Sequence, residues 1–69
     1  MDEEIDALLN LHNAGKISRL EILDQLWAQL ARKDSSCQWN VVEKLRQRSD
    51  ETASFVANLL AEIIENRDK

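Results

Sequence analysis

The sequence predicts an all-α protein, a small bundle of three to four short antiparallel helices. The 69 residues include one Gly and no Pro, so the chain has almost none of the turn-forming residues that β-hairpins and tight turns need. The hydrophobic share of 43% and the charged share of 32% are typical of a folded soluble domain rather than a disordered segment. Apolar residues also recur every three to four positions along successive stretches. We therefore expect a single helical domain over residues 1–69.

The first predicted helix runs from about Asp2 to Asn13. At 100° per residue, one face of it carries Ile5, Leu8, Leu9 and His12. Its first turns are crowded with carboxylates, which the helix dipole favours there: Asp2, Glu3, Glu4 and Asp6. Gly15 lies just past the last periodic residue, so it is the predicted C-terminal cap.

The second predicted helix opens at Ser18 and ends near Lys33. Its apolar stripe, widened on one side by Ile22 and Leu26, contains Leu20, Leu23, Trp27 and Leu30. The stretch from Ser18 to Glu21 has the form of a capping box, in which the serine hydroxyl accepts a hydrogen bond from the Glu21 amide. Ile17, which precedes this box, is expected to pack against Ile22 as a hydrophobic staple.

A polar break at residues 34–36 offers several N-cap candidates before the third predicted helix, from about Cys37 to Gln47. Its inward residues are expected to be Trp39, Val42 and Leu45. In so small a protein, the two indoles of Trp27 and Trp39 are most simply core residues of the second and third helices. An interface role is the alternative, because tryptophan is enriched at binding hot spots.

The fourth predicted helix is capped by Ser49 or Asp50 and has the widest apolar stripe. Its paired apolar positions, repeated at intervals of four, are Phe55, Val56, Leu59, Leu60, Ile63 and Ile64. This stripe covers roughly half the circumference, more than the ~100° that a surface helix usually needs. Either the other helices wrap around this helix, or part of it faces a second copy of the chain. The sequence leaves both arrangements open.

Residues Asn10 to Glu21 partly match a calcium-binding loop of the EF-hand type, with Gly15 at loop position 6 and Glu21 at position 12. Positions 1, 3 and 5 would be Asn10, His12 and Ala14, which supply no carboxylate. The leucine pattern of the first helix also continues through this region. We therefore expect helix followed by a capping box, with no metal site. A degenerate EF-hand-like hairpin without calcium binding stays as an alternative interpretation.

A second alternative is a small nucleic-acid-associated regulator that uses the basic stretch 32–48. Its candidate contacts are Arg32, Lys33, Lys44, Arg46 and Arg48. The net charge of −4 argues against this function, because phosphate binding draws its affinity from clustered Lys and Arg. Cations near helix C-termini are also explained by the helix dipole alone.

Two residues carry reactive groups, His12 and Cys37. His12 is expected to be a boundary residue of the last turn of its helix, and Cys37 a small buried apolar residue. Together they could in principle form a nucleophile and a base. Catalysis also needs a concave pocket that excludes water, and a bundle this small has little interior to spare. We therefore expect no enzymatic activity, no catalytic residues, no cofactor and no small-molecule substrate.

The function that these patterns favour is binding to a protein partner or to a second copy of the chain. The expected contact residues are Phe55, Leu59 and Ile63 of the fourth helix, with Trp39 as a second anchor. No apolar run reaches the ~18 residues of a membrane span, and Met1 to Asp6 are acidic where a secretory signal would be basic and then apolar. A single Cys agrees with a reducing compartment. We expect a cytoplasmic protein without membrane contact.

Overall fold

The computed structural model describes residues 2–67, and this part of the chain folds into four helices and contains no strand. The helices are α1 (Asp2–Asn13), α2 (Arg19–Leu30), α3 (Ser35–Arg46) and α4 (Glu51–Arg67). The predicted all-α bundle is confirmed, and the third helix is a separate element. None of these helices has the length and apolar character needed to cross a lipid bilayer.

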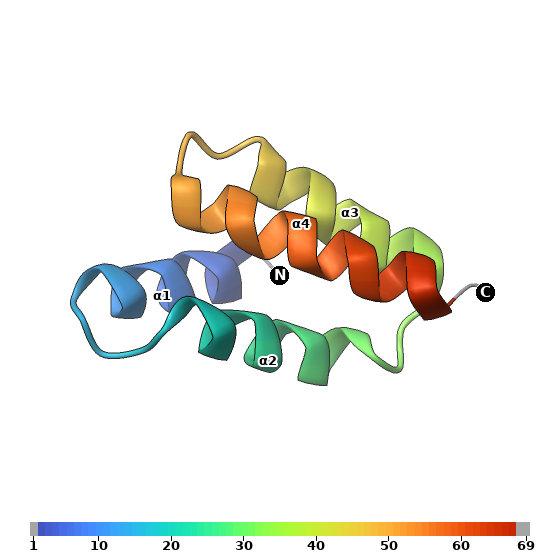
Figure 1. Ribbon diagram of the computed structural model, residues 1–69, viewed down its shortest axis with the longest axis horizontal. Helices are drawn as coiled ribbons and strands as arrows, with labels where there is room; N and C mark the ends of the chain where they lie inside the picture. The colour runs from blue at the N-terminus through green and yellow to red at the C-terminus, as the bar shows by residue number, and fades with distance from the viewer. Residues whose placement is uncertain (1, 68–69) are drawn as a thin grey trace.

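Each helix runs opposite in direction to the one before it, so the chain forms two helical hairpins that face each other (Figure 1). The α1–α2 hairpin lies against the α3–α4 hairpin. The closest packing is between α3 and α4, followed by α2 with α4 and α1 with α2. Helix α4 therefore lies between α2 and α3, although α2 and α3 are neighbours in the sequence. Since α2 and α4 run in the same direction, their ends lie beside each other.

All four helices contribute to one hydrophobic core. The largest side chains that are fully enclosed in it are Ile5, Ile22, Leu26, Leu30, Leu45, Leu60 and Ile64. Helix α4 adds a line of small buried residues at Ala53, Ala57 and Ala61. Complete burial of a Leu or Ile side chain contributes about 1.5–3 kcal/mol, so this core is the main source of stability.

The turn between α1 and α2 closes with hydrogen bonds that end one helix and start the next. Gly15 has a φ of 77°, and its amide donates to the His12 carbonyl at 2.9 Å, while the Lys16 amide donates to the Leu11 carbonyl at 2.9 Å. These two bonds form the Schellman motif, for which glycine supplies the left-handed backbone. The predicted cap at Gly15 is confirmed. His12 Nδ1 adds a bond to the Ile17 carbonyl at 2.9 Å, which binds the end of α1 to the start of α2.

The three remaining helix starts are each capped by a side-chain oxygen. Ser18 Oγ accepts from the Glu21 amide at 3.2 Å, as the capping box predicts. Asp34 Oδ1 accepts from the Cys37 amide at 2.8 Å, so α3 begins at Ser35, two residues earlier than predicted. Asp50 Oδ1 accepts from the Thr52 amide at 2.8 Å, which makes Asp50 the N-cap of α4.

Two sequence-based expectations about burial are wrong. Leu20, predicted on the inward stripe of α2, is 59% exposed, because the buried stripe is centred on Ile22 and Leu26 instead. Cys37, expected to be buried, is exposed in the first turn of α3. The core position that it was expected to fill belongs to its neighbour Gln38, which is only 2% exposed.

Candidate functional site

The fourth helix carries a line of half-buried apolar residues along the flank that faces α2. Phe55, Leu59 and Ile63 are spaced by four residues, and each packs against the core while keeping part of its surface accessible. Arg19 of α2 contacts this line, because its guanidinium lies 4.3 Å from the centre of the Phe55 ring. The predicted contact residues of α4 therefore form one continuous stripe.

Helix α2 contributes two more apolar side chains to this surface. Trp27 is half-buried, and Leu20, seven residues earlier on the same side of α2, is the most exposed large apolar residue among residues 2–67. We call the surface formed by Leu20, Trp27, Phe55, Leu59 and Ile63 the α2–α4 seam. Trp27, Phe55, Leu59 and Ile63 pack against the core, and the exposed Leu20 extends the surface along α2.

An arginine stacks on an aromatic ring at each end of the α2–α4 seam. Arg19 covers Phe55 at the end where both helices begin. At the other end, the guanidinium of Arg67 lies 5.5 Å from the centre of the Trp27 ring, and its Nη1 donates to the Ala31 carbonyl at 3.0 Å. The second contact caps an open carbonyl at the C-terminus of α2. The Arg67 end of the seam therefore carries a positive charge, whereas at the other end Arg19 lies close to acidic residues of the α3–α4 turn and the start of α4.

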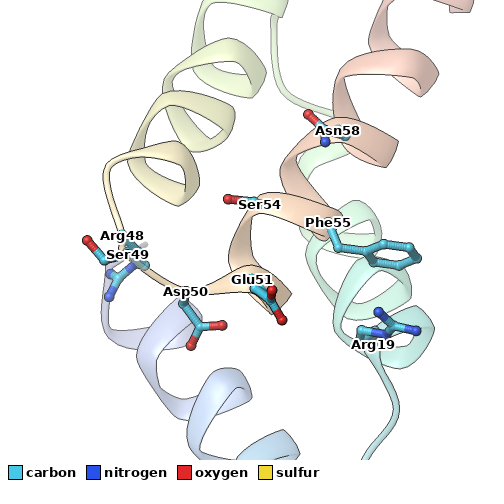
Figure 2. Close-up of a pocket in the computed structure, with 8 residues that line it drawn as sticks. All are labelled: Arg19, Arg48, Ser49, Asp50, Glu51, Ser54, Phe55 and Asn58. Carbon is cyan, nitrogen blue, oxygen red and sulfur yellow. The ribbon is translucent and has the colours of Figure 1, made fainter.

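An open hollow of about 560 Å³ continues the seam at its Arg19 end (Figure 2). Its lining comes from the α3–α4 turn, the first turns of α4 and the start of α2: Arg19, Arg48, Ser49, Asp50, Glu51, Ser54, Phe55 and Asn58. In Figure 2 the Arg19 side chain lies beside the Phe55 ring, while Asp50 and Glu51 turn their carboxylates outward. These groups can form hydrogen bonds and ion pairs with a docked surface.

Two of the five cations proposed for nucleic-acid contact are already paired with carboxylates of α1. Lys44 Nζ lies 3.3 Å from Asp2 Oδ1, and Arg48 forms an ion pair with Asp6. These pairs join the start of α1 to the end of α3 and compensate the cations. The other three cations proposed for nucleic-acid contact are exposed and form no ion pair with the described residues: Arg32, Lys33 and Arg46.

Residues Asn10 to Asn13 lie in the last turn of α1, as expected, so the first part of the supposed calcium loop is helical. No group of three or more His, Cys, Asp or Glu side chains that could hold a metal ion occurs among residues 2–67. His12 is in the last turn of α1 and Cys37 in the first turn of α3, at opposite ends of the bundle in Figure 1. A nucleophile and base pair between them is therefore not formed.

Trp39, predicted as a second contact anchor, lies apart from the α2–α4 seam. It is half-buried on α3, which packs on α4 from the side opposite to α2. Sequence reasoning placed Trp27 in the core and did not single out Arg19 or Arg67. Arg67 follows Ile63 by four residues, so the spacing that defines the stripe could have predicted its position. The position of Arg19 depends on the packing of α2 against α4, for which the sequence offers no local signal.

No protein-family model, curated protein or solved structure matches this chain.

Proposed function

We propose that this protein is a binding module without enzymatic activity, which docks another protein along the α2–α4 seam. The observation that carries this proposal is the line of Phe55, Leu59 and Ile63, which stays only half-buried on a helix that two neighbouring helices already cover. Contiguous exposed apolar surface of this kind marks interaction sites more often than isolated apolar residues do. Leu20 and Trp27 widen the surface beyond a single helix.

The composition of the seam supports a protein partner. Binding hot spots are enriched in Trp and Arg and are surrounded by residues that exclude water. Trp27 and Phe55 supply rigid rings, and Arg67 and Arg19 lie stacked on them. Stacked side chains have already lost much of their rotamer freedom, so binding would immobilise them at a lower entropic cost.

The geometry supports an α-helical binding segment. The exposed apolar residues of α4 follow one line at intervals of four, and α2 runs beside them in the same direction. An amphipathic helix can place its own apolar residues along such a line, with anchors at positions i, i+4 and i+7. The α2–α4 seam would then receive a third helix from a partner.

Selection from a helical peptide library tests the proposed function. Peptides enriched on the native protein should lose most of their binding when Leu59→Glu places a charge in the middle of the seam. The matched control is Leu11→Glu, the same change at a leucine that is 39% exposed on α1 and lies outside the seam. Circular dichroism verifies that both variants remain helical. Equal binding to the native protein and to Leu59→Glu would contradict the proposal.

Size-exclusion chromatography with light scattering tests the nature of the partner. A native protein that remains monomeric at high micromolar concentration would identify a different chain as the partner. A dimer that Leu59→Glu dissociates and Leu11→Glu leaves intact would identify a second copy of the chain as the partner.

A further inference from the structure

We propose that the partner on the α2–α4 seam is a second copy of the chain, bound antiparallel about a two-fold axis at Leu59. This inference rests on the proposed function and specifies the partner. The helix that the seam receives is then α4 of the other copy. The inference follows from the order of residues along α4, from the places of Leu20 and Trp27 on α2, and from the opposite charges at the two ends.

The apolar stripe on α4 is part of a longer line that is complementary to itself when reversed. At intervals of four residues, α4 carries Glu51, Phe55, Leu59, Ile63 and Arg67. Leu59 is at the centre, with a large apolar residue four positions to each side. Eight positions to each side the charges are opposite, a carboxylate before the centre and a guanidinium after it. Lines of residues at intervals of four are the ridges through which two helices commonly pack.

A two-fold axis that is perpendicular to α4 and lies in the plane of the seam matches this order. It relates each position to the one equally far on the other side of Leu59. Leu59 meets Leu59 of the second copy, Phe55 meets Ile63, and Glu51 meets Arg67. The last two contacts each occur twice, because such an interface uses the same surface of both copies. The outer pair lies about 12 Å from the axis, at 1.5 Å per residue.

Two contacts between α2 and α4 fix the register of these parallel helices. Arg19 lies over Phe55, and Arg67 donates to the Ala31 carbonyl. Both contacts join positions that differ by 36 (55 − 19 = 36; 67 − 31 = 36). Since the two contacts lie at opposite ends of the seam, this offset holds along its whole length.

Helix α2 has the same symmetry in its part of the seam. The offset of 36 places Leu59 level with Leu23 (59 − 36 = 23). Leu20 is three positions before this level, and Trp27 is four positions after it. The axis at Leu59 therefore brings Leu20 of one copy close to Trp27 of the other. The symmetry of the stripe on α4 and the spacing on α2 are independent observations that give the same axis.

The end of the seam at the start of α4 has more carboxylates than unpaired cations. Asp50 and Glu51 line the hollow there together with Arg19 (Figure 2). The other cation of the hollow, Arg48, is paired with Asp6 of α1. Two carboxylates therefore accompany one guanidinium that has no ion pair.

The opposite end of the seam has an excess of cations. Arg67 binds the carbonyl at the end of α2, and the exposed Arg32 and Lys33 follow directly in the chain. The carboxylates near it are directed elsewhere: Asp34 caps α3, and Glu65 lies about 120° around α4 from the centre of the stripe. An antiparallel copy brings the positive end of each seam over the negative end of the other. A parallel copy would bring each end against itself, so the charges select the antiparallel arrangement.

The axis also brings like charges together at Asp24. This exposed residue follows the level of Leu59 by one position and lies about 60° around α2 from Trp27. The Asp24 carboxylates of the two copies are therefore close to the axis. The Glu62 carboxylates are farther apart, by about 9 Å along α4, because each is three positions from Leu59. Repulsion at Asp24 weakens the dimer and gives a test of the axis that does not depend on α4.

Charge exchange at the ends of the stripe tests this inference. Glu51→Arg sets guanidinium against guanidinium at both ends of the dimer, and Arg67→Glu sets carboxylate against carboxylate. Sedimentation equilibrium gives the dissociation constants. We expect the native protein to dimerise at high micromolar concentration and each single exchange to weaken the dimer about tenfold, because two exposed ion pairs become two repulsions. Leu11→Glu is the control outside the seam and should dimerise like the native protein.

An equimolar mixture of the two single variants is the sharpest measurement. In the mixed dimer every end contact again joins a guanidinium to a carboxylate, so the native affinity should return. The double variant with both exchanges should recover it as well. Loss of the Arg67 bond to the Ala31 carbonyl is a defect within one chain, and mixing with Glu51→Arg would not repair it.

Two further changes test the axis while Arg67 stays in place. Leu59→Glu and Leu59→Lys should each dissociate the dimer, and their mixture should restore it in part, because Leu59 faces itself about this axis. Asp24→Asn should tighten the dimer severalfold, and high salt should reduce this gain. Circular dichroism verifies that every variant remains helical.

The outcomes separate the failure of this inference from the failure of the proposed function. A dimer that Leu59→Glu dissociates, but that neither mixture restores, has another register and overturns the inference. A native protein that is monomeric at high micromolar concentration overturns it too. Peptides that bind such a monomer through the seam would leave the proposed function standing, with a different chain as partner. If no peptide binding to the monomer depends on Leu59, both proposals are overturned.

Discussion

The two flanks of α4 carry matching lines of residues and meet their neighbours differently. Ala53, Ala57 and Ala61 repeat every four residues on one flank and are buried. Phe55, Leu59 and Ile63 repeat with the same spacing on the side of α2 and are half-buried. By the rotation of 100° per residue, these lines lie on opposite sides of the helix.

Side-chain size accounts for this difference. The separation between packed helices depends on the residues at the contact, and small residues allow the backbones to approach closely. The closest packing in the bundle is between α3 and α4, and the alanines lie on the side of α4 opposite to the stripe beside α2. On the other side, bulky residues fill the space between α4 and α2 and extend to the surface. One flank of α4 is therefore closed by packing, and the other keeps part of its apolar surface accessible.

Reversing the sizes of the side chains on the two flanks should give the largest change in stability. Ala57→Leu adds bulk to the closed flank, and we expect it to lower the free energy of unfolding by about 1–3 kcal/mol. Leu59→Ala removes bulk from the half-exposed flank and should cost only about 1 kcal/mol. Urea unfolding followed by circular dichroism measures both. If Ala57→Leu were as stable as the native protein, the alanine flank would not be closed.

The end of α2 allows a similar comparison between a buried and an exposed hydrogen bond. Gln38 Nε2 donates to the Leu30 carbonyl at 2.7 Å and to the Lys33 carbonyl at 3.1 Å, inside the protein. Arg67 donates to the Ala31 carbonyl at the surface. Gln38→Met keeps the length of the side chain and removes both of these hydrogen bonds, while the Leu30 carbonyl keeps its bond from the Lys33 amide. At about 0.5–1.5 kcal/mol for each lost bond, the variant should cost about 1–3 kcal/mol.

Arg67→Gln is the exposed counterpart and should cost less than about 1 kcal/mol, because water can replace its bond. Thermal unfolding of the two variants in parallel measures the difference. Equal losses would mean that the open side of the bundle is as important for stability as the closed side.

The ion pairs between α1 and α3 should make a smaller contribution. Asp6→Asn and Asp2→Asn remove the carboxylates that pair with Arg48 and Lys44. Each pair is partly exposed, and we expect losses of up to about 1 kcal/mol that shrink as salt is added. Melting curves at low and high sodium chloride measure this. A loss that salt does not change would show that the aspartate contributes through packing rather than charge.

The smallest effect is expected from the exposed carboxylate of Glu4. A hydrogen bond from its own backbone amide, at the start of α1, is the main cause that lowers the pKa of this group. The unfolded chain therefore binds the proton more readily, and the stabilisation by Glu4 is present above the unfolded pKa of about 4.3. It is lost as the pH falls through the folded pKa. Melting temperatures between pH 6 and pH 3 should fall slightly less steeply for Glu4→Gln, and identical slopes would contradict this prediction.

Local signals in the sequence predicted the helices well. The bounds of α1 agree with the prediction, because acidic residues mark its start and Gly15 its end. The caps at Ser18 and Asp50 were also predictable, since a short polar side chain before an apolar run satisfies the first free amides. Helix α2 ends at Leu30 rather than near Lys33, because the chain turns toward α3 before the basic residues.

Features that depend on contacts between helices could not be predicted in this way. Gln38 is buried because carbonyls at the end of α2 need a donor, and an amphipathicity pattern counts it as polar. Leu20 is exposed because α2 packs on the rest of the bundle through the line of Ile22 and Leu26, and Leu20 lies outside this line. The α2–α4 seam was predicted only in its α4 half, Phe55, Leu59 and Ile63, for the same reason. Its binding function stays a proposal.

The place of α4 between α2 and α3 has a consequence for the order of events during synthesis. Residues 1–50 leave the ribosome before α4, yet α2 and α3 pack more closely on α4 than on each other. In the emerging chain, the apolar faces of α2 and α3 therefore lack α4, the helix on which both of them pack. At 5–20 residues per second, translation of α4 takes on the order of one second. During that interval the unfinished chain exposes apolar surface to chaperones and to other nascent chains. This exposure ends when α4 is complete and packs between α2 and α3.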